Sequence, residues 1–214
     1  MKAVSLLVRK PEITRAAFRD YYEHQHCTLA MQHFPFQRYV RNHLVGGDDR
    51  FGFDCISEFG MADDFRGVNL MGSRSRQMLE ADEREFMRPE LIRVAAAEEH
   101  VLFEAARHGP SLRRHVLLFC HEGRDQQVLR EKIEKLGVEL AQHLDSVSQI
   151  TMDILSSDPA QPFPFDALLW IQTENLGGLP PQVNAVPGWA GALEVATCAS
   201  SEDELRKRFV AFQP

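Results

Sequence analysis

The chain lacks the features that mark membrane and nucleic-acid-binding proteins. Its 214 residues include 31 acidic against 24 basic side chains, for a formal net charge of −7, and neither half has a basic excess. Binding to nucleic acid normally requires a basic surface, so we expect no such partner. No apolar run approaches the roughly 20 residues that span a bilayer, and the start MKAVSLLVRK does not resemble a signal peptide. We therefore expect a cytoplasmic protein with no membrane partner.

Cysteine is sparse and scattered. The four cysteines show no CxxC pair, so we expect reduced thiols rather than disulfides or a thiolate zinc site. The sequence also lacks a phosphate-binding glycine loop, a GxSxG motif and a zinc signature. We therefore predict no metal site and no cofactor. The composition that remains, 44% apolar and 26% charged, is typical of a globular protein.

The first half of the chain alternates between strand-like and helix-like segments. Short apolar or β-branched runs predict strands, and longer stretches with a helical apolar period predict helices. Thr14 is a suitable N-cap for the first helix, and Pro89 follows the end of the second. The predicted strands cover residues 2–8, 36–45, 53–59 and 97–105, and the predicted helices cover residues 14–33 and 71–86. This β-α-β-β-α-β order is typical of a ferredoxin-like unit.

The pattern starts again in the second half. A shift of 111 positions aligns Leu6 with Leu117 and Phe18 with Leu129, and core positions continue to match over about 50 residues with one insertion, which indicates an internal repeat. In this second copy, LPPQVNAVPGW stands where the second helix is expected. ALEVATCA then predicts a strand, and SEDELRKRF predicts a helix with Ser201 near its N-cap.

These two copies predict the fold class. A ferredoxin-like sheet carries helices on one face only, so its other apolar face must be covered. We expect an α+β protein of two tandem ferredoxin-like units, residues 1–107 and 108–214. Their antiparallel sheets would pack face to face, as in the dimeric α+β barrel type, and would leave room for a cavity. We expect the first unit to carry the site and the second to be a degenerate copy.

The stretch FRDYYEHQHCTLA contains two histidines in a predicted helix. One helical face carries apolar residues and His26, at the positions Phe18, Tyr22, His26, Leu29 and His33. His24 lies roughly 200° from His26 around the helix, so the pair cannot chelate a metal ion. We expect His24 to be solvated. His26 is then either a hydrogen-bonded core histidine or a general acid or base.

A row of polar residues follows the second predicted strand. Tyr39, Arg41 and His43 alternate onto one face, where they either line the polar wall of a cavity or lie on a solvated sheet face. The shift of 111 positions aligns these residues and His26 with positions that are apolar or lack a side chain, namely Ile150, Met152, Ile154 and Gly137. This contrast is why we expect the site in the first copy.

On the second predicted helix, Asp82 shares a stripe with Leu79 and Phe86. An aspartate on an apolar stripe points inward and needs a partner. That partner is either a site residue or a nearby arginine, Arg76 or Arg84, in a purely structural pair.

Several of these segments resemble the EthD family. The resemblance is carried by LLVRKPEITRAAFRDYYEHQHCTLA, RYVRNHLV, FDCISEF and EADEREFM, and it is closest over residues 2–104. The family's helix motif reads histidine, any residue, proline, leucine. Here it reads His26-Cys27-Thr28-Leu29, so the proline is missing and the helix is expected to continue unbroken. The family's histidine matches His26 and its second-helix aspartate matches Asp82.

The resemblance implies a dimeric α+β barrel fold and a small-molecule lyase, of the decarboxylase or dehydratase type, acting on an aromatic or polyketide-like compound. We expect catalytic roles for His26, His43 and Asp82, and substrate binding by Tyr39, Arg41, Tyr22 and Phe86. The expected partner is a small-molecule substrate, with homodimer formation left open. The alternatives are a cofactor-free monooxygenase, a haem-binding barrel protein, or a non-catalytic binding or stress-response module.

Overall fold

The computed structural model describes residues 2–46, 49–62, 65, 68–106, 113–120, 126–144, 146–174, 176 and 179–214. The chain divides into two compact units. Unit 1 contains Met1–His43, Gly47–Val94 and Thr197–Pro214, and unit 2 contains Leu44–Gly46 and Ala95–Ala196. Among the described residues, no helix is long and apolar enough to cross a membrane.

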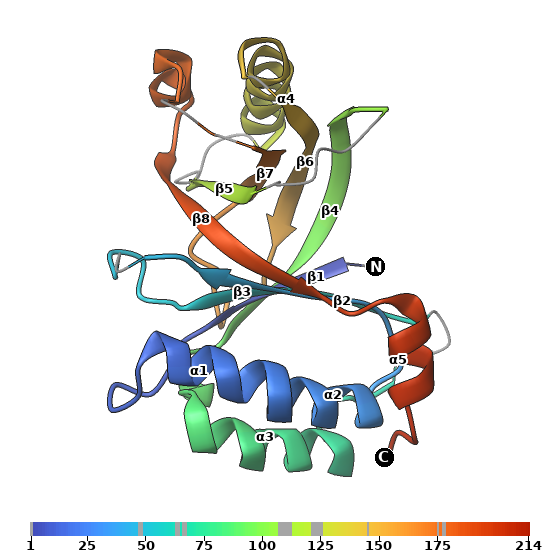
Figure 1. Cartoon of the computed structure of the whole chain (residues 1–214). Coiled ribbons are helices and arrows are strands. Elements are labelled where there is room, and N and C mark those ends of the chain that lie inside the picture. Colours follow the sequence, from blue (N-terminus) through green and yellow to red (C-terminus); the bar gives the residue numbers. More distant parts are fainter. Residues whose placement is uncertain are drawn as a thin grey trace. The chain divides into compact units, whose positions relative to one another are not determined.

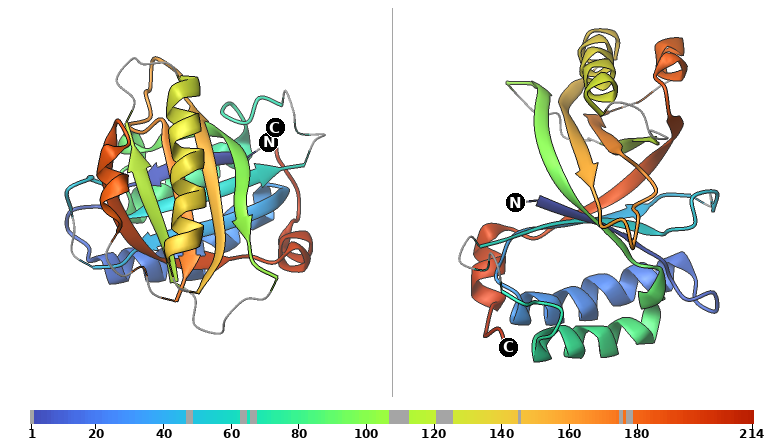
Figure 2. Two further views of the ribbon diagram at one scale, coloured as in Figure 1. Left: turned by 90° about the horizontal axis from the view of Figure 1, so that it is seen from above. Right: turned by 180° about the vertical axis from the view of Figure 1, so that it is seen from behind.

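Unit 1 is built from a small sheet with helices along one of its faces. Its strands are β1 (Lys2–Leu7), β2 (Phe36–Leu44) and β3 (Cys55–Met61), and its helical segments are α1 (Arg15–Tyr21), η1 (Tyr22–His26), α2 (Cys27–His33), α3 (Arg74–Phe86), η3 (Pro89–Leu91) and α5 (Glu202–Arg208). Strand β3 lies between β1 and β2 and is antiparallel to both. Figures 1 and 2 show α1, α2 and α3 on the same face of this sheet.

The first predicted helix is confirmed and contains a π-helical segment. Thr14 accepts a hydrogen bond from the Ala17 amide and caps α1, and η1 and α2 continue the helix to His33 without a break. A π-helical turn holds more residues than an α-helical turn. In η1, the consecutive residues Tyr22 and Glu23 therefore both face the sheet. Tyr22 and His26 are buried there, and the Glu23 side chain is only 13% exposed.

The core of unit 1 lies between these helices and the sheet. Its largest buried side chains include Phe18, Met31, Phe86 and Met87. The register aligns His43 with Cys55 and Arg41 with Ser57 across β2 and β3. The predicted polar row of β2 therefore lies on the helix-covered face, since the side chains of Arg41 and His43 both bond Glu23 of η1.

Unit 2 is built from a larger sheet, one long helix and one short 3₁₀ helix. Its elements are β4 (Arg93–Glu104), β5 (Arg113–Phe119), α4 (Gln126–His143), β6 (Val147–Ser156), β7 (Ala167–Thr173), the 3₁₀ helix η4 (Pro181–Ala185) and β8 (Trp189–Ala199). The short η4 occupies the segment where the sequence predicts no regular second helix. Figure 2 shows α4 lying along the strands of this unit, and contacts with β6 and β7 hold it there.

The shift of 111 positions aligns His26, Tyr39, Arg41 and His43 with residues that pack in the interior of unit 2. Ile150, Met152 and Ile154 belong to the apolar core beneath α4. At Gly137, a Cβ atom would lie 2.5 Å from the Leu102 side chain, so any larger residue would force that side chain to move. No histidine fits at the position that aligns with His26 unless its surroundings repack.

The α+β class with antiparallel strands is confirmed. The strand order is β1-β3-β2 in unit 1 and β8-β5-β7-β6-β4 in unit 2, and each pair with an assigned register is antiparallel. The predicted boundary between the two sequence copies, near residue 107, lies outside the described residues. The internal repeat itself stays a prediction.

Candidate functional site

His26 and Asp82 form a buried hydrogen-bonded pair between η1 and α3. The Nδ1 atom of His26 lies 2.7 Å from Oδ2 of Asp82, and the two side chains are only 6% and 18% exposed. The expected burial of His26 and its bond to a polar group are therefore confirmed. Because a carboxylate accepts but does not donate, Nδ1 carries the proton in this bond.

Tyr21 completes the hydrogen bonding of Asp82. Its hydroxyl donates to Oδ1 of Asp82 at 2.9 Å. Burial alone would raise the pKa of Asp82, but the hydrogen bonds from His26 and Tyr21 lower it below its ordinary value. Burial and the bond to this carboxylate raise the pKa of Tyr21 to about 12. At neutral pH, Asp82 is therefore ionised and Tyr21 is protonated.

Aromatic rings surround the imidazole of His26. Its centroid lies 5.1 Å from that of Tyr22 and 5.2 Å from that of Phe86, and Tyr21 stacks on Phe86 at 4.7 Å. These contacts fix the plane of the imidazole. The rings also make the surroundings of the imidazole largely apolar, and its bonded charged neighbour is the carboxylate of Asp82.

The second ring nitrogen of His26, Nε2, has no hydrogen-bond partner among the described residues, whereas Nδ1 is committed to Asp82. With the proton on Nδ1, Nε2 carries a lone pair that can accept a proton. Asp82 would stabilise the imidazolium that forms, which is the arrangement of an orienting carboxylate and a general base.

Glu23 organises a second polar cluster, which the sequence did not predict. Its carboxylate lies 2.8 Å from Nη2 of Arg41 and 2.6 Å from Nε2 of His43. Burial alone would raise the pKa of Glu23, but the bonds from His43 and Arg41 lower it to about 2. Glu23 follows Tyr22 in the sequence but is not one of the residues of the predicted apolar stripe. A charged residue at such a position is expected to face solvent, so the sequence did not indicate that Glu23 faces the sheet.

Arg41 and His43 are held tightly in this cluster. Arg41 also donates to the Tyr39 carbonyl at 3.1 Å and to Oγ of Ser200 at 2.9 Å, so its ion pair with Glu23 is fixed from two further sides. The His43 ring makes edge contacts with Phe18 and Tyr22. Its Nδ1 atom is buried and has no hydrogen-bond partner among the described residues.

Three hydroxyl groups form a buried chain beneath the helix. The Tyr39 hydroxyl donates to that of Tyr22 at 3.2 Å, and the Tyr22 hydroxyl lies 2.7 Å from Oγ of Ser57. Burial is the main cause that raises the pKa of both tyrosines. Tyr22 thus contacts both histidines, His26 at 5.1 Å and His43 at 5.6 Å between ring centroids.

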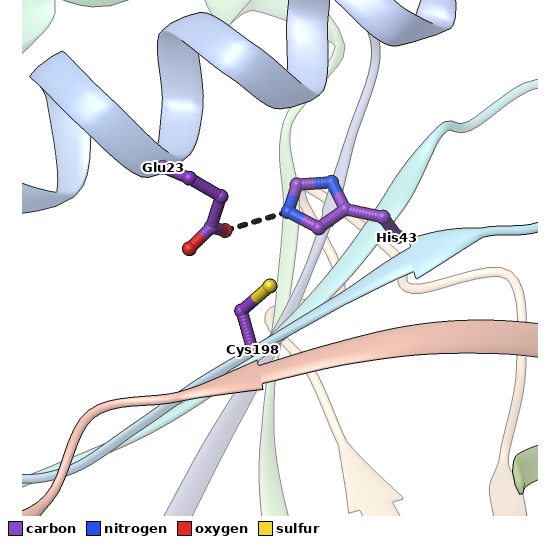
Figure 3. A group of neighbouring side chains, drawn as sticks. All are labelled: Glu23, His43 and Cys198. Atoms are coloured by element: carbon purple, nitrogen blue, oxygen red, sulfur yellow. Dashed lines mark hydrogen bonds and ion pairs between the residues drawn. The ribbon is translucent and has the colours of Figure 1, made fainter.

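Cys198 adds a thiol beside Glu23 and His43. Figure 3 shows the three side chains converging from η1, β2 and the end of β8. One donor atom from each residue lies within 4.8 Å of the other two. Cys198 is partly exposed, and Nη2 of Arg19 lies 3.8 Å from its sulfur.

The structure decides between the alternatives that the sequence left open. A structural pairing of Asp82 with Arg76 or Arg84 is wrong, because Arg76 pairs with Glu83 and Arg84 with Glu80.

His24 is exposed and lies 3.5 Å from Asp20, as expected for a solvated residue. The polar row of β2 is not a solvated sheet face, since Tyr39, Arg41 and His43 are all at most 5% exposed. The functional roles predicted for these residues stay predictions.

Comparison with known families agrees with this geometry. Residues 10–90 match the sequence profile of the EthD domain. The matched segment contains η1, β2, β3 and α3, and it therefore carries the His26–Asp82 pair, Glu23, Arg41 and His43. No protein with a curated description matches the sequence.

Solved structures of similar fold span nearly the whole chain. A proposed monooxygenase from Lactobacillus acidophilus matches with a TM-score of 0.54 and 7% identity, covering 94% of this chain and 95% of that one. An anthrone oxidase-like protein matches with a TM-score of 0.52 and 11% identity, covering 92% of each chain. A mutant chlorite dismutase from Candidatus Nitrospira defluvii matches with a TM-score of 0.50 and 12% identity, covering 98% of this chain and 94% of that one. At these identities, the likeness concerns the α+β barrel fold alone.

Proposed function

We propose that the protein is a small-molecule lyase that works by general acid/base catalysis at His26. The observation that supports this proposal is the 2.7 Å bond from His26 Nδ1 to Asp82, together with an Nε2 atom that no described residue hydrogen-bonds. Asp82 orients the imidazole of His26 from one side, and the lone pair of the unbonded Nε2 atom can accept a proton on the other.

The proposed reaction is a proton transfer at a carbon next to a carbonyl group. In a dehydration, Nε2 takes the proton from this carbon, the imidazolium is stabilised by Asp82, and the same proton is returned to the departing hydroxyl group, which leaves as water. In a decarboxylation, Nε2 takes the proton of the substrate carboxyl group, carbon dioxide leaves, and the imidazolium returns the proton to the resulting enolate. Both sequences need one proton carrier with a pKa near neutrality, for which imidazole is suited.

The proposed substrate is an aromatic or polyketide-like carbonyl compound. The rings of Tyr22 and Phe86 that flank His26 suit a flat apolar ligand. The guanidinium of Arg41 is already bound to Glu23, Tyr39 and Ser200, so it is less suited to hold a substrate oxyanion. We therefore assign proton transfer to His26 and Asp82, and we place His43 and Arg41 in a separate cluster.

A panel of aromatic β-keto acids and β-hydroxy ketones tests the proposal. The purified protein should release carbon dioxide or water from at least one of them, and His26→Ala should lower kcat/KM by about 10²–10⁴-fold. His24→Ala is the matched control, because His24 lies two residues away and is exposed. Turnover that survives in His26→Ala at the wild-type rate would rule out this mechanism.

The same preparation distinguishes the rival functions. An oxygen-consuming reaction with a phenolic substrate would favour a cofactor-free monooxygenase. A Soret band in the absorption spectrum would favour a haem protein, with a histidine as axial ligand. Ligand binding without any turnover would favour a binding module.

A further inference from the structure

Three chemically different donor groups converge at the cluster of Glu23, His43 and Cys198. They come from three segments far apart in the sequence, η1, β2 and the end of β8. A carboxylate oxygen, an imidazole nitrogen and a thiol sulfur lie within 4.8 Å of one another, and Figure 3 shows that their polar ends point toward a common centre. Mixed nitrogen, oxygen and sulfur ligands are typical of sites for Zn²⁺ and related divalent transition metals.

The cluster is rigid before any ion binds. Arg41 is bonded to Oε2 of Glu23 at 2.8 Å and is itself fixed by the Tyr39 carbonyl and Ser200. Oε1 of Glu23 faces His43 at 2.6 Å and also accepts a longer bond of 3.2 Å from Nε of Arg41, so it is the oxygen on the side of the proposed ion. Hydrogen bonding of a ligating carboxylate by a neighbouring residue is a common feature of protein metal sites.

We propose that Glu23, His43 and Cys198 bind a divalent transition-metal ion of the zinc type. The ligand atoms would be Oε1 of Glu23, Nε2 of His43 and Sγ of Cys198. Three protein ligands leave one position of a tetrahedral ion open for water or a small molecule, as in catalytic rather than structural zinc sites. This inference is independent of the proposed lyase function, which rests on His26 and Asp82.

Binding exchanges protons and charges in a defined way. The Cys198 thiol loses its proton to solvent, and the proton on Nε2 of a neutral His43 moves to Nδ1. The carboxylate of Glu23 and the thiolate of Cys198 then carry two negative charges against the two positive charges of the ion and the one of Arg41, so the occupied cluster has a net charge of +1. Arg41 keeps its bond to Oε2, and Arg19 loses its long 3.8 Å contact with the sulfur. Because at least one proton is released, affinity should rise with pH.

Cobalt(II) provides a direct test. The whole chain, stripped with a chelator, is titrated with Co²⁺ and followed by absorption spectroscopy. We expect a thiolate-to-cobalt charge-transfer band and the intense visible bands of a tetrahedral ion, with one equivalent bound and with Zn²⁺ displacing the cobalt. Circular dichroism checks the fold of each variant, and no substrate is needed.

Two variants and one control make the result decisive. Cys198→Ser should abolish the charge-transfer band, and Glu23→Gln should weaken binding at least about tenfold, in the range found when metal-site residues are altered. Cys120→Ser is the matched control, because Cys120 is also a partly exposed cysteine without a disulfide and lies outside the cluster, and it should keep the full spectrum. The proposal is overturned if Co²⁺ produces no such bands, or if the bands persist in folded Cys198→Ser. His26→Ala should bind Co²⁺ normally, so loss of lyase activity and loss of metal binding are separable.

Discussion

Asp82 on α3 bonds His26 on η1 at 2.7 Å, across 56 positions of the sequence. The pair joins the two helical segments that lie on the same face of the unit 1 sheet, and Tyr21 binds the other oxygen of the same carboxylate. A single aspartate therefore sets both the tautomer and the orientation of the proposed base.

Asp82→Asn should lower kcat/KM by about 10²–10⁴-fold while the fold is retained. The amide keeps the size of the side chain but removes the charge that stabilises the imidazolium of His26. It can also present its N–H₂ group to Nδ1 and so favour the wrong tautomer. Steady-state kinetics with circular dichroism measures both effects. A variant that is fully active at every pH would contradict the assigned role.

Tyr21→Phe should have a smaller effect, below about tenfold, since Tyr21 acts on Asp82 and not on the substrate. Its clearest signature is spectroscopic. The phenol whose pKa is raised to about 12 should disappear from the alkaline absorbance titration at 295 nm. In Asp82→Asn, the pKa of the same phenol should fall part of the way toward its ordinary value of about 10, because burial, the largest cause of the shift, stays while the effect of the carboxylate is lost. An unchanged titration of this phenol in Asp82→Asn would show that the bond between Tyr21 and Asp82 does not form.

Glu23→Gln should destabilise the protein by about 3–5 kcal/mol, the usual cost of removing one partner of a buried ion pair. The change leaves Arg41 buried at 5% exposure without its counter-charge. Glu80→Gln is the control, because Glu80 pairs with Arg84 on the surface of α3 and should cost less than about 1 kcal/mol. Urea denaturation monitors both variants, and equal costs would contradict the buried pairing of Glu23.

Acid should destabilise the wild type through Glu23. Its pKa falls from 4.5 to about 2 on folding, so the folded state favours the ionised carboxylate. The stabilisation is fully present above pH 4.5 and is lost as the pH falls toward 2. The free energy of unfolding, measured in urea at a series of pH values, should fall less steeply over this window in Glu23→Gln. A parallel pH dependence in the variant would contradict the assigned pKa.

Ser73→Ala should cost about 1 kcal/mol through the loss of the N-cap of α3. The Ser73 hydroxyl accepts from the Arg76 amide at 3.0 Å and donates to the Leu70 carbonyl. Because α3 carries Asp82, a frayed first turn would lower the melting temperature before it affects the rate. Ser201→Ala, at the cap of α5, is the comparison that leaves α3 untouched.

The sequence by itself determined the elements and the faces of unit 1. Apolar spacing alone placed His26 on the buried stripe of its helix and Asp82 on the inward face of the next. The same reasoning excluded a chelate of His24 and His26. Strand alternation placed Tyr39, Arg41 and His43 on one face. These inferences succeeded because they depend on local backbone geometry, which a few neighbouring residues fix.

Only the tertiary structure decided which of these faces meet. The partner of Asp82 is His26 and not an arginine of its own helix, because helix packing brings together residues 56 positions apart. Glu23 was missed because a regular helical period gives no reason to bury it, whereas the π-helical turn of η1 and the cation of Arg41 do. Cys198 approaches His43 from the far end of the chain. Contacts of this kind depend on how whole elements pack, and no short stretch of sequence encodes them.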